Sequence, residues 1–292
     1  MKLKVSVVTC VKNVEKYVSK RILSLLDFLN NEFGREIIGI IATIYLFFKF
    51  KRWCHIFYDE AWIFKYHDGT IVDPKLNFKS ISDIKKESSD YWFYIYKPTR
   101  GDIIIDVGAG TGNYTLSFSS MVGSLGKVVA IEAHPKTFLC LSKMCKYNNL
   151  KNVILYNYAV TDKEMDVFMG NSSSHLANTI LNQKKGIKIQ GITLDRLLRN
   201  HNIENINFLK MNIEGAEKLA IKGMKNTLKK TKFICIACHD FRNKRNMKTK
   251  EIIINFLRKN GFKIITRNTD EREWVRDHVH GVNRKENLKT LP

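Results

Sequence analysis

The stretch DIIIDVGAGTGN, from Asp102 to Asn113, constrains the fold of this chain more than any other. Its apolar run, Ile103–Val107, predicts a short strand that is buried on both faces, and a helix-compatible segment begins at Tyr114. The three alternating glycines between them predict a tight turn that lets a ligand lie against the backbone, because glycine has no Cβ. They are Gly108, Gly110 and Gly112.

The spacing of these glycines is informative about the ligand. Dinucleotide-binding turns use GxGxxG and phosphate loops use GxxxxGK[ST], whereas this turn is GxGxG with a carboxylate, Asp106, two residues ahead. That carboxylate would repel a pyrophosphate and would suit a ligand with a cationic amino group. A second acid, Glu132, ends the next apolar run, Lys127–Ile131. Nucleotide-binding α/β folds place there the acid that binds ribose hydroxyls. We therefore expect S-adenosyl-L-methionine (SAM) as the cofactor.

The expected cofactor site follows from these two acids. Asp106 and the glycine turn are assigned to the methionine moiety, Glu132 to the ribose, and the strand end at Asn157–Ala159 to the adenine region, together with Asp162. The predicted cofactor-binding residues are Asp106, Gly108, Ala109, Gly110, Gly112, Asn113, Glu132, Ala133, Asn157 and Ala159.

From Asp102 onward, predicted strands and helices alternate, which indicates an α/β fold with a doubly wound, mostly parallel sheet. The expected strands are 103–107, 128–131, 153–156, 206–211 and 233–237, with an edge hairpin formed by 262–266 and 274–279. The expected helices are 114–121, 135–148, 193–199, 217–228 and 248–260, and a looser polar stretch follows Tyr156.

Residues 1–90 are expected to form a helical and hairpin appendage to a catalytic domain at 91–292. Within the appendage, Val5–Val8 predicts a strand and Val14–Leu29 a helix, and Trp62–Val72 predicts a hairpin that turns at Asp68-Gly69. Residues 80–96 are expected to connect the appendage to the catalytic domain through one helix.

The run Ile37–Phe48 has twelve residues without a charge. A membrane-spanning helix needs about 20 apolar residues, so we expect a buried helix packed on the core. The alternative is a helix in a membrane interface, in which Lys49, Lys51 and Arg52 meet anionic headgroups and Trp53 lies at the boundary.

The formal net charge of +21 attracts nucleic acid, anionic membranes or acidic substrates, and it does not distinguish among them. No secretory leader is apparent, so the six cysteines are expected in a reducing compartment, the cytoplasm, with peripheral attachment to the inner face of the membrane as an alternative. We expect all six to be small buried apolar residues. Cys235 and Cys238 lie three apart on a predicted strand, which disfavours a shared metal or a disulfide.

Several segments of the chain resemble FkbM-type SAM-dependent methyltransferases. They are DVGAGTGNYT, VVAIEAHP, NNLKNV, AVTD at 159–162, ITLDRLL at 192–198 and FLKMNIEGAE at 208–217, and they occur in the family's order from about Gly101 to Phe262. The resemblance implies a seven-stranded class I methyltransferase fold. It also implies O-methylation of a hydroxyl, often on a sugar or a glycosylated product.

The chain departs from that family at two positions. Asn212 stands where the family usually has Asp, and Ala237 stands where it commonly has the Glu of a Glu-x-His pair. Each change removes a carboxylate from the expected cleft. A carboxylate base and a metal site are therefore not carried over from the family, and no metal is expected.

The expected catalytic residues are His239, Asn212 and Glu214. An unperturbed imidazole titrates near neutral pH, so His239 is the candidate general base, with Asp240 to orient it. Two alternatives stay open for this cluster. His239 can simply hydrogen-bond a loop, or a cation can be held by these three residues.

Two other classes of function compete with this interpretation. The positive charge suggests an RNA methyltransferase, although Asn212–Gly215 is not the [DN]PP[YF] segment of base-directed enzymes. The two missing carboxylates suggest a non-catalytic binding module. The expected acceptor is a small molecule or a glycan, including lipid-linked glycans, and nucleic acid is the less favoured partner.

Overall fold

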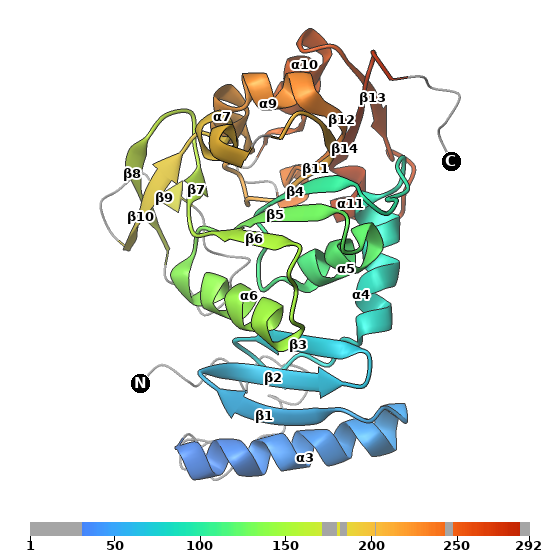
Figure 1. Ribbon diagram of the computed structural model, residues 1–292, viewed down its shortest axis with the longest axis vertical. Helices are drawn as coiled ribbons and strands as arrows, with labels where there is room; N and C mark the ends of the chain where they lie inside the picture. Colours follow the sequence, from blue (N-terminus) through green and yellow to red (C-terminus); the bar gives the residue numbers. More distant parts are fainter. Residues whose placement is uncertain (1–30, 171–179, 182–185, 202, 243–247, 287–292) are drawn as a thin grey trace.

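The structure is a computed structural model that describes residues 31–170, 180–181, 186–201, 203–242 and 248–286 (Figure 1). The strand expected at Val5–Val8 and the helix expected at Val14–Leu29 lie outside the described residues. The same holds for Cys10.

A seven-stranded sheet forms the centre of the molecule, in the order β13-β14-β12-β11-β4-β5-β6 (Figure 1). Strands β6, β5, β4, β11 and β12 are parallel, and β14 is antiparallel to both of its neighbours. This confirms the predicted class I methyltransferase fold. The strands are β4 (Ile103–Val107), β5 (Lys127–Ile131), β6 (Val153–Tyr156), β11 (Ile206–Met211), β12 (Thr231–Ala237), β13 (Phe262–Thr266) and β14 (His278–Asn283).

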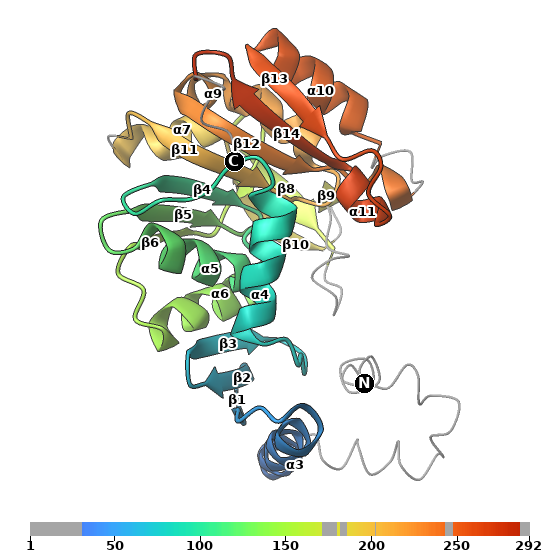
Figure 2. The same ribbon diagram turned by 90° about the vertical axis from the view of Figure 1, so that its right-hand side faces the viewer.

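Helices cover both faces of this sheet, because its strands are apolar on both sides. Ile104 and Phe208 pack on one face with Phe118 of helix α5, and Ile105 and Leu209 pack on the other. The ribbon view shows helices on both sides of the sheet (Figure 2). The first face carries α4 (Ile81–Glu87), the π-helix η1 (Ser88–Trp92), α5 (Asn113–Val122) and α6 (Pro135–Tyr147). The second carries α7 (Leu194–Leu198), α8 (Glu217–Ala220), α9 (Lys225–Lys230) and α10 (Lys250–Lys259).

Two predicted elements differ from the structure. The single helix expected at 217–228 is broken by the 3-10 turn η4 (Ile221–Gly223). A Cβ on Gly223 would lie 2.2 Å from the carbonyl oxygen of Thr161, so a loop from another part of the chain occupies the space beside this turn. The strand expected at 274–279 begins only at His278, because residues 273–276 form the short helix α11 (Glu273–Arg276).

The polar stretch after Tyr156 forms a second, four-stranded sheet that was not predicted, in the order β7-β10-β8-β9. Buried side chains alternate along it at Val167, Met169 and Ile189. The strands are β7 (Ala159–Val160), β8 (Met165–Met169), β9 (Ile180–Leu181) and β10 (Ile187–Ile192).

The N-terminal part of the described chain forms helix α3 (Glu32–Phe50) and an antiparallel sheet of β1 (His55–Asp59), β2 (Ala61–Tyr66) and β3 (Gly69–Asp73). The predicted hairpin is present, with Tyr66 paired to Gly69. Phe64 of β2 and Leu141 of α6 share one hydrophobic cluster, so the small sheet packs directly on helix α6 of the central fold (Figure 1).

Helix α3 is only half buried, so the prediction of a buried helix was wrong for one of its faces. Ala42 and Leu46 are buried, and Gly39 approaches β1 so closely that a Cβ would lie 2.5 Å from the Ile56 carbonyl oxygen. The opposite face exposes large apolar side chains. They are Phe33, Ile40, Ile41, Ile44, Tyr45, Phe47 and Phe48, with Trp53 just beyond the helix. In the described part of the chain, no helix combines the length and the apolar character needed to cross a bilayer.

Candidate active site

A pocket opens at the carboxyl ends of β4, β5 and β11, where parallel sheets of this kind bind their ligands. Its walls are the glycine turn after β4, Glu132 after β5, and the segment that follows β11. Another side is closed by Ala159, at the start of the short strand β7, and by Met169, at the end of β8.

Most of the predicted site residues line this pocket. They are Gly108, Ala109, Gly110, Asn113, Glu132, Ala133, Ala159, Asn212 and Glu214. Four others do not line it, and the structure gives each of them a different role. They are Asp106, Gly112, Asn157 and His239. Tyr114, Met169 and Lys210 line the pocket and were not among the predicted site residues, whereas Tyr158, which also lines it, lies within the predicted strand end at 157–159.

Asp106 does not face the ligand space, which corrects its assignment to the amino group of the cofactor. Its side chain is fully buried, and its two oxygens are already used. Oδ1 accepts a hydrogen bond of 2.8 Å from Nζ of Lys210, and Oδ2 accepts one of 2.7 Å from the Thr115 hydroxyl. The carboxylate therefore organises the floor of the pocket from below.

Lys210 is the partner that links Asp106 to the pocket. Its side chain is 1% exposed, and its Nζ also donates to the carbonyl oxygen of Gly108 at 2.6 Å. One ammonium group thus connects β4, β11 and the glycine turn. Because a buried charge is costly without a partner, each member of this ion pair depends on the other.

The glycines of the turn serve different purposes. A Cβ on Gly108 would lie 2.0 Å from the carbonyl oxygen of Asn212, so this glycine lets the ends of β4 and β11 meet. Gly112 packs against Met144 and Leu141 of α6 rather than against the pocket. Only Gly110 has open space around it, with φ of +62°, and it lines the pocket. Gly110 is therefore the position where a ligand can approach the backbone.

Glu132 lies at the end of β5 with its carboxylate bound by backbone amides. Its oxygens accept hydrogen bonds from the N–H groups of Gly110 and His134, each at 2.9 Å. Burial raises the pKa of Glu132, and these two amides oppose that effect. Asn157 supports this loop from behind, because its side-chain amide donates to the carbonyl oxygens of Glu132 and Ala133.

Two amide side chains in the pocket carry a buried oxygen that has no hydrogen-bond partner among the described residues. These oxygens are Oδ1 of Asn113 and Oδ1 of Asn212. Buried polar atoms are nearly always hydrogen-bonded, so two free acceptors that border one pocket indicate a ligand with donor groups. The two acceptors, the acid at Glu132 and the open backbone at Gly110 fit a nucleoside with a cationic amine.

Beside the pocket, His239 lies between two carboxylates. Its Nε2 is 3.4 Å from Oε1 of Glu214, and its Nδ1 is 3.5 Å from Oε1 of Glu217. Burial alone would lower the pKa of His239, but its interactions with these two carboxylates outweigh burial and raise the pKa to about 9. The imidazole is therefore cationic at neutral pH, which removes it as the resting general base. Asp240 does not orient it, because Asp240 Oδ1 accepts the backbone N–H groups of Thr249 and Lys250.

Glu214 connects this cluster to the pocket. Its Oε2 is 2.8 Å from Nη1 of Arg242, and its Oε1 faces His239. Its backbone has φ of +54°, which is uncommon for a residue with a side chain and is followed by Gly215 at +100°. Glu217 is fully buried and accepts the backbone N–H groups of Ile213 and Gly215, so it fixes this loop. The site is thus built from a carboxylate held between two cations.

Replacing Lys210 by Met should destabilise the protein by about 3–5 kcal/mol, because Asp106 would remain buried without its cation. The double variant Lys210→Met/Asp106→Asn should recover part of this loss. Urea unfolding of the wild type, both single variants and the double variant measures the coupling. Additive effects of the two changes would contradict the role given to the ion pair.

The elevated pKa of His239 predicts a pH-dependent contribution to stability. The folded-state pKa of about 9 lies above the unfolded value, so this contribution is complete below pH ~6.5 and is lost as pH rises through 9. It amounts to about 3 kcal/mol at most. Urea unfolding from pH 6 to pH 10 should show this loss in the wild type and not in His239→Gln. Parallel curves for the two proteins would contradict it.

The methyltransferase FkbM domain family matches residues 106–264. A probable cobalt-precorrin-6B C(15)-methyltransferase (decarboxylating) from Saccharolobus solfataricus is 28% identical over 141 residues, which is 43% of this chain and 70% of that protein.

Two solved structures are also similar in fold. One is the methyltransferase FkbM from Methylobacillus flagellatus, with a TM-score of 0.46 and 14% identity, over 66% of this chain and 50% of that one. The other is Aeropyrum pernix fibrillarin in complex with SAM, with a TM-score of 0.43 and 12% identity, over 77% of this chain and 94% of that one.

Proposed function

The chain belongs to the methyltransferase FkbM domain family, and on this premise we propose that it transfers a methyl group from SAM to a hydroxyl of a sugar or of a glycosylated or lipid-linked product. The observation that carries the proposal is the pocket at Gly110. Three features border this pocket. They are the amide oxygens of Asn113 and Asn212, which have no partner among the described residues, the carboxylate of Glu132, and the open backbone at Gly110.

The cofactor would be held by residues at the ends of β4 and β5. Glu132 would accept hydrogen bonds from the ribose hydroxyls, because each of its oxygens has a lone pair left after accepting one from a backbone amide. We now assign the amino group of the methionine moiety to Asn113 instead of Asp106, since the free Oδ1 of Asn113 can accept a hydrogen bond from that group. SAM supplies an electrophilic methyl group on a sulfonium centre.

The acceptor would be bound on the side of the pocket formed by the segment after β11. The free Oδ1 of Asn212 would accept a hydrogen bond from a neighbouring donor group of the substrate and thereby orient the acceptor. Glu214 is the carboxylate at this end of the pocket, and it would accept the proton that the reacting hydroxyl loses when SAM gives up its methyl group and leaves as S-adenosylhomocysteine. The cations of His239 and Arg242 hold Glu214 in place.

Glu214→Gln should lower turnover by about 10²-fold or more and leave SAM affinity unchanged, because a positioned base acts only on the acceptor. The assay incubates the chain with methyl-labelled SAM and extracts separated into glycan, lipid, RNA and small-molecule fractions, and calorimetry reports SAM binding. Asp166→Asn, at an exposed carboxylate outside the pocket, is the matched control.

Label in the glycan or lipid fraction supports the proposal. Label in RNA, or on a cobalt-precorrin as in the name of the Saccharolobus solfataricus protein, would overturn the acceptor class. A wild-type chain that binds no SAM would overturn the enzymatic function as a whole.

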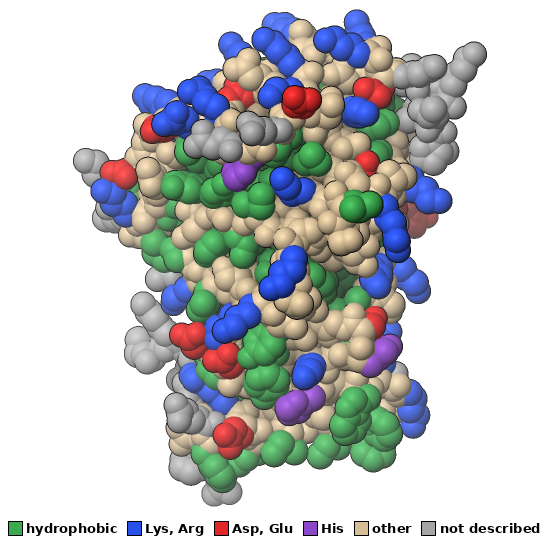
Figure 3. Space-filling model, in the orientation of Figure 1, with side chains coloured by type: hydrophobic (Ala, Val, Ile, Leu, Met, Phe, Trp, Pro, Cys, Tyr) green, Lys and Arg blue, Asp and Glu red, His purple; other side chains and the backbone are tan. Residues whose placement is uncertain are grey.

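We also propose that the exposed face of α3 rests on an anionic membrane. Phe48 is 67% exposed, Trp53 66% and Ile40 60%, whereas isolated surface apolar residues are the usual case in a soluble domain. The helix lies at one end of the molecule, and apolar side chains gather over it (Figure 3). Exposed Lys51 follows its last turn, in a chain with a net charge of +21. An apolar helix face next to basic residues is typical of interfacial helices.

Ile40→Asp/Ile44→Asp should abolish flotation of the full chain with vesicles that contain phosphatidylserine, because two charges would enter the acyl boundary. Leu125→Asp, at an 86% exposed leucine in the turn between α5 and β5, is the matched control and should float like the wild type. Binding to neutral vesicles alone, or no flotation of the wild type, would contradict this proposal.

A further inference from the structure

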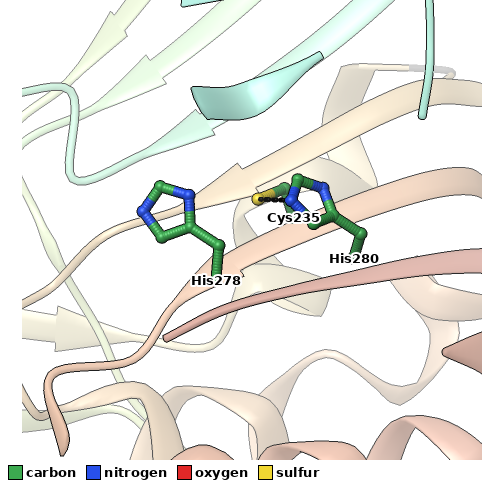
Figure 4. A group of neighbouring side chains, drawn as sticks. All are labelled: Cys235, His278 and His280. Carbon is green, nitrogen blue, oxygen red and sulfur yellow. Dashed lines mark hydrogen bonds between the residues drawn. The ribbon is translucent and has the colours of Figure 1, made fainter. Parts of the chain in front are cut away.

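A cluster of metal-ligand side chains lies on β12 and β14, among residues that the proposed reaction does not use. Cys235, His278 and His280 are all buried, and their ligand atoms lie within 4.8 Å of one another (Figure 4). Cys235 and His280 stand directly opposite each other in the antiparallel register of the two strands. None of the three lines the pocket.

A backbone oxygen from a third element completes the cluster. The carbonyl oxygen of Tyr91 in η1 is 3.1 Å from Nδ1 of His278 and 3.9 Å from Sγ of Cys235. Sγ is also 3.9 Å from Nε2 of His280. A tetrahedral zinc ion with bonds of about 2.0–2.3 Å separates its ligand atoms by about 3.3–3.8 Å. The separations between the ligand atoms of this cluster are therefore close to those around a tetrahedral zinc ion.

His280 has little compensation for its burial. It is 0% exposed, its Nδ1 has no hydrogen-bond partner among the described residues, and Nε2 faces only the sulfur. A buried polar ring without a good hydrogen bond costs free energy, and coordination of a metal would offset that cost.

We propose that Cys235, His278, His280 and the Tyr91 carbonyl bind a structural zinc ion. One thiolate and two imidazoles favour zinc over magnesium or calcium, which prefer oxygen ligands. Binding releases the Cys235 thiol proton to solvent. This assignment replaces the expectation that Cys235 is only a small apolar core residue.

The ion would join η1 to two strands of the central sheet. Trp92, the last residue of η1, stacks on His278 with ring centroids 4.8 Å apart. Nζ of Lys210 lies 5.2 Å above the Trp92 ring, so the metal site is two contacts away from the floor of the pocket. A zinc ion here would fix the position of Trp92 and, through it, of Lys210.

The test uses the full chain, unfolded in the presence of a chelator, refolded and titrated with Zn²⁺ or Co²⁺. We expect one ion per chain by elemental analysis, a thiolate-to-cobalt charge-transfer band, and a higher Tm with zinc. A wild-type chain that gives no thiolate band with cobalt would overturn the proposal, and this measurement does not depend on any variant or on methyl transfer.

The variants separate ligation from packing. Cys235→Ala should weaken zinc binding at least about tenfold, since even outer partners of a metal contribute that much. Cys238→Ala is the matched control, because Cys238 follows the same strand and is equally buried but lies outside the cluster. His280→Gln is the second variant, with circular dichroism as the check on folding. Equal zinc affinity in Cys235→Ala and Cys238→Ala would rule out the site.

Discussion

The ion pair between Asp106 and Lys210 is the interaction on which the rest of the site depends. It joins the two central parallel strands at 2.8 Å, with both side chains buried, and its ammonium also binds the carbonyl oxygen of Gly108. A buried pair adds little stability over an apolar pair of the same size, but it fixes one arrangement of its surroundings. Here that arrangement is the glycine turn, the end of β11, and hence the relative positions of Gly110 and Glu214.

The fold could be predicted from the sequence because its strands carry a strong local signal. Runs such as Ile103–Val107 and Ile206–Met211 are rich in apolar residues, and the parallel order follows from their alternation with helices. Strand β14 was placed four residues too early, because HVHGVN contains polar residues that are buried only through long-range partners. The second sheet was missed for a similar reason, since its strands are short and polar on one face.

The roles of single site residues were harder to predict than their presence at the site. The position of Asp106 before the glycine turn indicated a site residue. Whether its carboxylate faces a ligand or a lysine depends on Lys210 of β11, about a hundred residues later in the chain. The role of His239 changed because two carboxylates, Glu214 and Glu217, come together around it only in the folded chain. The local sequence therefore identified candidate residues such as His239, whereas the charge state of His239 depends on neighbours that only folding brings close.

The position of β14 has a consequence for how this protein folds. It follows β13 in the chain but lies between β13 and β12 in the sheet. Until residues 278–283 leave the ribosome, the edge of β12 has no partner and exposes its backbone hydrogen-bonding groups. The sheet therefore closes on this side only after β14 has been synthesised, and this late long-range pairing slows folding and leaves the edge of β12 open to self-association until then.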